Sequence, residues 1–104
     1  MSKKLINRRP AIFVDVDGTL ILWSNRNGRL VHKLNRALVE HLTETDNEAD
    51  LILWSRRGRQ YAQRMAEHHR VDHLFVAIIG KPTAIIDDEG LEWMRGVKLN
   101  PKNW

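Results

Sequence analysis

One stretch of the sequence decides the fold: Ile12-Phe13-Val14-Asp15-Val16-Asp17-Gly18-Thr19. Three apolar residues lead directly into two aspartates at positions i and i+2, and side chains at that spacing share one face of an extended strand. A buried strand that ends near Val14 therefore delivers Asp15 and Asp17 together at its carboxyl end, where open α/β sheets bind their ligands. Two carboxylates held this close bind a cation, share a proton or perform acid–base chemistry.

Apolar runs and helical stripes alternate along the rest of the chain. The patterns predict strands at about 11–16, 51–54, 74–79 and 83–86, helices at about 32–45 and from near Arg57, a helical turn at 90–93 and a brief strand at 97–99. Asn27-Gly28 is a turn signal between two short extended pieces. Because strands alternate with helices, we expect an α/β fold with a parallel sheet covered by helices on both faces, a three-layer arrangement.

The composition limits the class of protein. A chain of 104 residues has no room for a second core, so we expect one domain spanning 1–104, with residues 1–9 as a flexible basic arm. There is no cysteine, which excludes disulfides and thiolate chemistry. No stretch approaches the roughly 20 apolar residues of a membrane span, and the basic start lacks the apolar core of a signal peptide. We therefore expect a cytoplasmic protein without a membrane partner.

The charge is basic, with a formal net charge of +4 and a pI near 9.9. Several of the acids belong to the candidate site, so the rest of the surface is more basic than the net charge suggests. Such a surface favours an anionic substrate, with nucleic acid as a candidate partner.

Further polar residues follow the other predicted strands. Ser55 closes the apolar run 51–54, Lys81 follows the strand at 74–79, and Asp87-Asp88 close the run 84–86. The carboxyl ends of parallel strands meet at one edge of a sheet, so these side chains are expected to gather around Asp15.

In this order, the motifs resemble the four signatures of the haloacid dehalogenase (HAD) superfamily, most of whose members are Mg²⁺-dependent phosphatases. The resemblance spans about residues 11–90 and implies a Rossmann-like sheet, with the hairpin around Asn27-Gly28 as the "flap" of that family. The two places where larger members insert cap domains hold only a few residues here. The chain therefore resembles a minimal, capless member, which leaves the substrate undefined.

The resemblance assigns roles to individual residues. Asp15 would attack phosphorus and form an aspartyl-phosphate, while Asp17 would protonate the leaving oxygen and then activate water. Mg²⁺ would be held by Asp15, by the main-chain carbonyl of Asp17 and by an acid of the later pair. Relatives favour Asp88 as the direct ligand and Asp87 as the partner that orients Lys81, but the choice between the two acids stays open.

The remaining candidate site residues are expected to bind the phosphate group or to shape the loop around it. Ser55 is expected to hold phosphate oxygens together with free N–H groups of a following helix, and Lys81 to neutralise the charge on the phosphoryl group. Gly18 permits a tight backbone in the substrate loop, which Thr19 steadies. Each has a structural alternative: Ser55 as a helix N-cap, Lys81 as a solvent-exposed loop residue, and Asp87-Asp88 as an acidic turn.

Three arginines and one tryptophan are candidates for contacts with the substrate. Arg56, Arg57 and Arg59 follow Ser55 and are candidates for contacts with distal phosphates of a nucleotide or nucleic acid. The alternative is a solvated first helical turn, although cations disfavour that end of a helix. Trp23, on the flap, is a candidate for stacking on a base or for packing within the hairpin.

His68, His69 and His73 are candidate ligands for a zinc ion. His69 and His73 have i, i+4 spacing, but Val71-Asp72 has the character of a helix end and no cysteine is available. The sequence therefore favours Mg²⁺ over zinc.

Two other classes of aspartate site, a calcium-binding loop and a receiver domain, do not match the sequence. A calcium-binding EF-hand loop needs ligands where this chain has Thr19 and Arg26, and a phosphoacceptor receiver domain has its acid pair and its phosphoacceptor in the reverse order. The sequence thus predicts a Mg²⁺-dependent phosphomonoester hydrolase that acts on a phosphorylated substrate, with nucleotide or nucleic-acid ends favoured and homo-oligomers allowed. The alternatives are a small-metabolite phosphatase and a catalytically silent phosphate- or nucleic-acid-binding module of the same fold.

Overall fold

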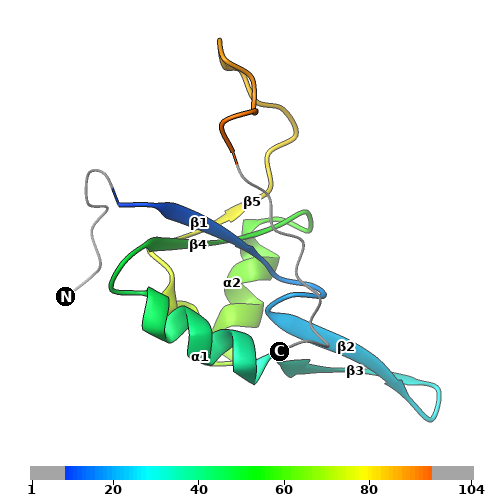
Figure 1. Cartoon of the computed structure of the whole chain (residues 1–104). Helices are drawn as coiled ribbons and strands as arrows, with labels where there is room; N and C mark the ends of the chain where they lie inside the picture. Colours follow the sequence, from blue (N-terminus) through cyan, green and yellow to red (C-terminus); the bar gives the residue numbers. More distant parts are fainter. Residues whose placement is uncertain (1–8, 95–104) are drawn as a thin grey trace.

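The protein is a small α/β structure, seen in a computed structural model that describes residues 9–94 (Figure 1). Three strands, β1 (Ala11–Asp15), β4 (Asp50–Ser55) and β5 (Ala77–Gly80), form a parallel sheet in the order β1-β4-β5. Two more, β2 (Ile21–Arg26) and β3 (Arg29–Leu34), form an antiparallel hairpin. The helices are α1 (Arg36–Thr45) and α2 (Arg59–His68), followed by the 3₁₀ turn η1 (Asp72–Leu74).

The central strand β4 sets the alignment of the parallel sheet. Its apolar run is buried almost throughout, as expected for a strand with neighbours on both edges, and Leu51 and Leu53 have no exposed surface. Asp15 pairs with Trp54, and Ser55 pairs with Gly80. The carboxyl ends of all three strands therefore lie at one edge of the sheet.

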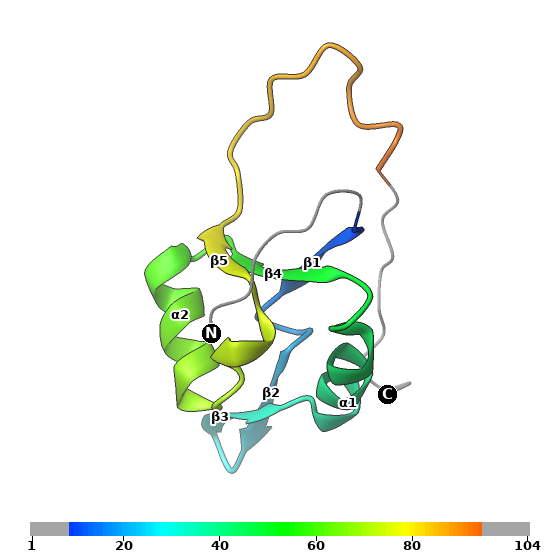
Figure 2. The same ribbon diagram turned by 90° about the vertical axis from the view of Figure 1, so that its left-hand side faces the viewer.

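Both helices pack on the same face of this sheet (Figures 1 and 2). The core combines Val14 and Leu53 from the strands with Leu38 of α1 and Ala62 of α2. On the opposite face the rings of Phe13 and Trp54 lie 4.5 Å apart, and Phe13 keeps 44% of its surface exposed. The parallel sheet is thus as expected, whereas within residues 9–94 helices cover one face rather than both.

Each helix begins directly after a residue that suits a helix start, Asn35 for α1 and Gly58 for α2. Asn35 caps α1, because its side-chain oxygen accepts a hydrogen bond from the amide of Leu38. The helix predicted from about residue 32 starts at Arg36, since 32–34 pair with β2 in the hairpin. The second helix starts at Arg59, after Gly58 in a left-handed conformation (φ +100°).

Two predictions of extended structure need correction. The strand predicted at 74–79 begins at Ala77, because Asp72–Leu74 form a 3₁₀ turn. The strand predicted at 83–86 does not form: this segment is exposed, pairs with no other described strand, and projects from the sheet (Figure 1). An apolar run becomes a strand only when a partner edge is available, which sequence alone does not reveal.

Two further predictions concern the ends of the chain: a flexible arm at 1–9 and a strand at 97–99. Arg9, placed by the sequence in a flexible arm, is anchored: its Nη2 donates to the carbonyls of Asp46 and Ala49 at 2.6 and 2.8 Å, and its Nε lies 3.7 Å from Asp50. The rest of that arm and the strand predicted at 97–99 lie outside the described residues. No helix within residues 9–94 has the length and apolar character needed to cross a membrane.

Candidate active site

Three predicted site residues meet at the carboxyl edge of the parallel sheet. Asp15 ends β1, Ser55 ends β4, and Lys81 directly follows β5. The backbone amide of Lys81 donates to the carbonyl of Ser55 at 2.9 Å, which fixes where its side chain starts. That side chain then places Nζ 3.0 Å from Oδ1 of Asp15. Residues from three neighbouring strand ends thus form one cluster.

The loop after β1 is tightly folded on itself. Gly18 has a φ of +83°, as its expected tight backbone required, and its amide donates to the carbonyl of Ile21 at 2.8 Å. The hydroxyl of Thr19 lies 3.4 Å from Oδ2 of Asp15, a long contact that orients the carboxylate. Asn35 holds the loop from outside, because its side-chain amide donates to the Thr19 carbonyl at 3.1 Å.

Asp17 has a different set of partners from Asp15. Its Oδ1 accepts a 2.6 Å hydrogen bond from the hydroxyl of Tyr61 on α2 and a 2.9 Å hydrogen bond from the indole N–H of Trp23 on β2. The two carboxylates therefore occupy distinct environments, one facing an ammonium group and the other facing neutral donors. In paired-acid sites, such a difference in surroundings allows one acid to act as the nucleophile and the other as the proton donor.

Tyr61 remains a hydrogen-bond donor over the whole physiological pH range. Burial and the hydrogen bond to Asp17 raise its pKa from 10.0 to about 12, against the opposing effect of Arg57. The guanidinium carbon of Arg57 lies 4.0 Å from the centroid of the Tyr61 ring, a cation–π arrangement. The hydrogen bond from Tyr61 therefore links Asp17 to α2 throughout the physiological pH range.

Ser55 is not the cap of α2. The N-cap position belongs to Gly58, and the Ser55 hydroxyl instead accepts a 3.0 Å hydrogen bond from the amide of Arg57 within the turn that precedes the helix. Ser55 is buried, while the side chains of Arg56, Arg57 and Arg59 are exposed on and after that turn. The turn therefore presents cationic side chains beside the strand ends.

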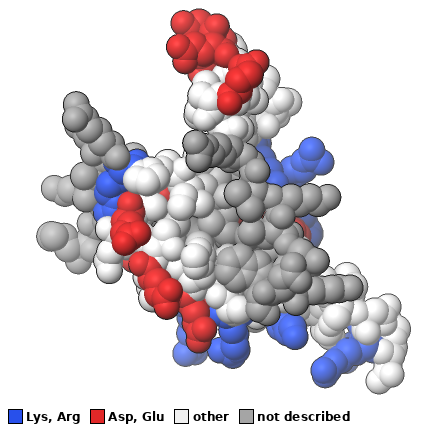
Figure 3. Space-filling model, viewed as in Figure 1, with Lys and Arg blue, Asp and Glu red and all other residues white. Residues whose placement is uncertain are grey.

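The acid pair Asp87-Asp88 is not brought to this cluster. Residues 82–89 are exposed, and Oδ1 of Asp87 accepts a local hydrogen bond from the amide of Glu89 at 2.9 Å. The space-filling view shows acidic side chains gathered at the tip of the projecting segment (Figure 3). In this arrangement the pair forms the acidic turn that the sequence left open as the alternative.

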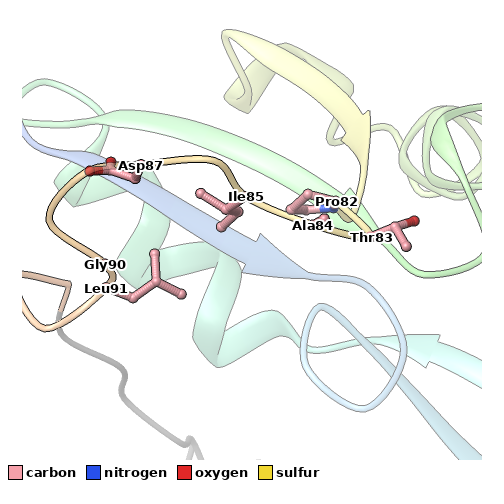
Figure 4. Close-up of a pocket in the computed structure, with 7 residues that line it drawn as sticks. All are labelled: Pro82, Thr83, Ala84, Ile85, Asp87, Gly90 and Leu91. Atoms are coloured by element: carbon pink, nitrogen blue, oxygen red, sulfur yellow. The ribbon is translucent and has the colours of Figure 1, made fainter.

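The projecting segment encloses a hollow of its own, with a volume of about 280 Å³. Its lining residues are Pro82, Thr83, Ala84, Ile85, Asp87, Gly90 and Leu91 (Figure 4). Neither Asp15 nor Lys81 lines it, and Asp87 lies at the far end of the segment from Thr83. The hollow is therefore separate from the cluster at the strand ends.

Two contributors to the site were missed by the sequence analysis. Neither Tyr61 nor Asn35 belongs to a motif that the sequence pattern singles out. An asparagine at the start of a helical stripe is nevertheless an N-cap signal, so Asn35 could be found from sequence. Tyr61 reaches Asp17 across 44 positions of sequence, and no local pattern predicts that contact.

The donor set can be compared with what Mg²⁺ requires. Mg²⁺ prefers oxygen ligands in octahedral geometry and retains several waters. Asp15 offers carboxylate oxygens, and no backbone amide within residues 9–94 donates to the main-chain carbonyl of Asp17. These oxygens suit Mg²⁺ in kind, but the second acid that the sequence predicted is not beside them.

The comparisons with known proteins find no matching family model, no matching curated protein and no matching solved structure.

Proposed function

We propose that this protein is a Mg²⁺-dependent phosphomonoester hydrolase of the capless HAD type, which works through an aspartyl-phosphate on Asp15. The observation that supports it best is the 3.0 Å contact between Lys81 and Asp15 at neighbouring strand ends. A lysine held against a carboxylate nucleophile supplies the positive charge that a phosphoryl group needs as it approaches. The parallel sheet supports the HAD-type fold in its coarse features.

In the first step, a carboxylate oxygen of Asp15 forms a bond to phosphorus while the bond from phosphorus to the leaving oxygen breaks. Asp17, in its protonated form, donates its proton to that leaving oxygen. Lys81 balances the charge on the phosphoryl oxygens, and the turn after Ser55 offers further donors to them. Trp23 and Tyr61 orient the Asp17 carboxyl group through its Oδ1.

In the second step, Asp17 takes a proton from water, and the water oxygen attacks phosphorus. The bond between phosphorus and Asp15 breaks, which releases inorganic phosphate and restores both acids. Mg²⁺, held by Asp15 and the Asp17 carbonyl, would screen the repulsion between the nucleophile and the phosphate.

Participation of Asp87 or Asp88 would require the segment after β5 to move. Within residues 9–94, β1 pairs only with β4, so the other edge of β1 has no described partner. Ile12 and Phe13 on β1 are 39% and 44% exposed, and Ile86 is fully exposed. Pairing of 83–86 beside β1 would bury these residues and carry the acids toward Asp15.

The substrate is proposed to be a bulky phosphate end, with nucleotides and nucleic acids favoured. Asp15 keeps 35% of its side chain exposed and Lys81 keeps 29%, and the exposed arginines of the turn add positive charge nearby. An open, cationic site suits a phosphate on a large substrate. Small phosphorylated metabolites are the competing substrates, with closure by a second copy of the chain as one way to retain them.

A silent phosphate-binding module is the second candidate function. The observation that favours it is the position of the acid pair, since a site lacking its second acid would bind phosphate without efficient metal-assisted transfer.

The two candidates separate in one assay of phosphate release from an aryl phosphate, with Mg²⁺ and with EDTA. Metal-dependent release supports the hydrolase. A protein that binds phosphate esters but releases none in either condition supports the module. Once release is found, 3′-phosphorylated oligonucleotides are compared with sugar phosphates over a range of salt, because binding to nucleic acid weakens steeply with salt.

A further inference from the structure

Three histidines converge away from the strand ends, from elements far apart in the sequence. His32 lies on β3, His68 ends α2, and His69 follows it. One ring nitrogen from each lies within 4.8 Å of the others. Nδ1 of His32 and Nε2 of His69 are 3.0 Å apart. The cluster differs from the sequence-based zinc reading, because His32 takes the place that His73 had there.

The spacing of these nitrogens suits a tetrahedral metal ion. With Zn–N bonds of about 2.0–2.1 Å, the nitrogens of two ligands on one tetrahedral ion lie about 3.3–3.4 Å apart. Nδ1 of His32 and Nε2 of His69 are already 3.0 Å apart, and one nitrogen can be chosen from each of the three rings so that all three lie within 4.8 Å of one another. Small rotations of exposed or half-buried rings bridge that difference.

We propose that His32, His68 and His69 form a zinc site that fastens the β2–β3 hairpin to the end of α2. The fourth position on the metal is left to water. The cluster consists of imidazole nitrogens, so it selects zinc over Mg²⁺, which prefers oxygen.

The protonation of the rings is compatible with this role. The contact between His32 and His69 joins two ring nitrogens, so one donates and the other accepts. For both of these nitrogens to bind a metal, the proton between them moves to the outer nitrogen of the donor ring, so that each neutral ring carries its single N–H on the side facing away from the metal.

The zinc site would also steady the candidate active site. The ring of Trp23 lies 4.8 Å from that of His32, and its indole N–H donates to Asp17. Tyr61, the other partner of Asp17, lies on α2. Zinc between β3 and α2 would therefore hold the β2–β3 hairpin, which carries Trp23, against the helix that carries Tyr61.

The test is calorimetric titration of the full chain with Zn²⁺, after EDTA treatment and in excess Mg²⁺ to occupy oxygen sites. We expect one equivalent to bind and to raise the unfolding temperature. His68→Ala should weaken binding at least about tenfold and remove the thermal shift. His68 is exposed at a helix end, so this variant should fold. His73→Ala is the matched control, since His73 is exposed and outside the cluster.

Zinc binding by the wild type and by His73→Ala, lost in His68→Ala, supports the site. A wild type that binds no zinc overturns it, as does zinc binding that His68→Ala leaves unchanged or that His73→Ala also removes. His32→Gln tests the ligand from the hairpin and should also weaken zinc binding. Zinc binding that this variant retains contradicts the proposed site.

Discussion

The ammonium group of Lys81 lies 3.0 Å from Oδ1 of Asp15, so the residue that follows β5 balances the charge of the residue that ends β1. The contact depends on register: Ser55 pairs with Gly80, and the Lys81 amide donates to the Ser55 carbonyl. The position of the lysine is thus set by backbone hydrogen bonds of the sheet.

Lys81→Met should lower kcat by about 10²–10³-fold, the cost of removing one fixed donor from a developing charge. Steady-state kinetics on an aryl phosphate measure it. Lys81→Arg should recover part of the loss, because it keeps the charge. Lys33→Met, at an exposed position on β3, is the control and should behave as wild type. A loss below about threefold in Lys81→Met would remove Lys81 from the mechanism.

The hydrogen bond between Tyr61 and Asp17 predicts an unusual titration. Tyr61 is the only tyrosine of the chain, so its ionisation can be followed by ultraviolet absorbance. The folded protein should titrate with a midpoint of about 12, against 10.0 for an unperturbed tyrosine. Asp17→Asn should move the midpoint back toward 10.0, while Glu44→Gln on α1 should not. A wild-type midpoint at 10.0 would show that the hydrogen bond is absent in solution.

The same shift has a consequence for stability. Because the folded pKa of Tyr61 is raised, the unfolded chain loses this proton first as pH rises. The stability linked to this shift, which arises from burial of the hydroxyl and from its hydrogen bond to Asp17, is therefore complete below pH 10 and is lost between about pH 10 and about pH 12. Urea unfolding at several alkaline pH values should show a smaller decline in Tyr61→Phe than in wild type.

Asn35 joins the loop after β1 to α1, and its loss should destabilise the fold. The side chain is 4% exposed, caps α1 through Leu38 and donates to the carbonyl of Thr19. Asn35→Ala should cost roughly 1–3 kcal/mol in urea unfolding, from the lost cap and an unpaired carbonyl. Asn35→Asp retains the cap oxygen but not the donor, so the comparison separates the two contributions. A cost near zero in Asn35→Ala would contradict this role.

The acid pair gives a prediction about metal dependence. If 83–86 pairs with β1 during catalysis, Asp88→Asn should raise the Mg²⁺ concentration for half-maximal activity by about tenfold or more. Glu89→Gln, at the next exposed position, is the control. Protection of the 83–88 amides from hydrogen exchange on Mg²⁺ addition should accompany the effect. An unchanged Mg²⁺ requirement in Asp88→Asn would leave the pair as a surface turn.

The parts of the fold that sequence could predict are those governed by local pattern. Strands do end at Asp15 and Ser55, and Lys81 does follow a strand, so the cluster at the sheet edge could be anticipated. Only the run before Ser55 is buried as expected, because Ile12 and Phe13 of β1 are exposed. Asn27-Gly28 does turn a hairpin. These features follow from alternation, burial and turn residues alone.

The rest depends on contacts between distant parts of the chain. Tyr61 meets Asp17, and His32 meets His69, through packing that no spacing rule contains. The run 84–86 has the composition of a strand, yet it pairs with none of the strands in the described part of the chain, so propensity alone predicted the wrong element. The prediction that helices cover both faces of the sheet was wrong for residues 9–94, because the placement of layers is a property of the whole chain.

The role of Asp15 as nucleophile is tested by phosphate release from Asp15→Asn beside wild type, in Mg²⁺ and in EDTA, on protein shown to be folded. Asparagine keeps the shape of Asp15 but removes its nucleophilic carboxylate. We expect Mg²⁺-dependent release by wild type and none above background by Asp15→Asn. Release that survives Asp15→Asn would contradict an aspartyl-phosphate on this residue.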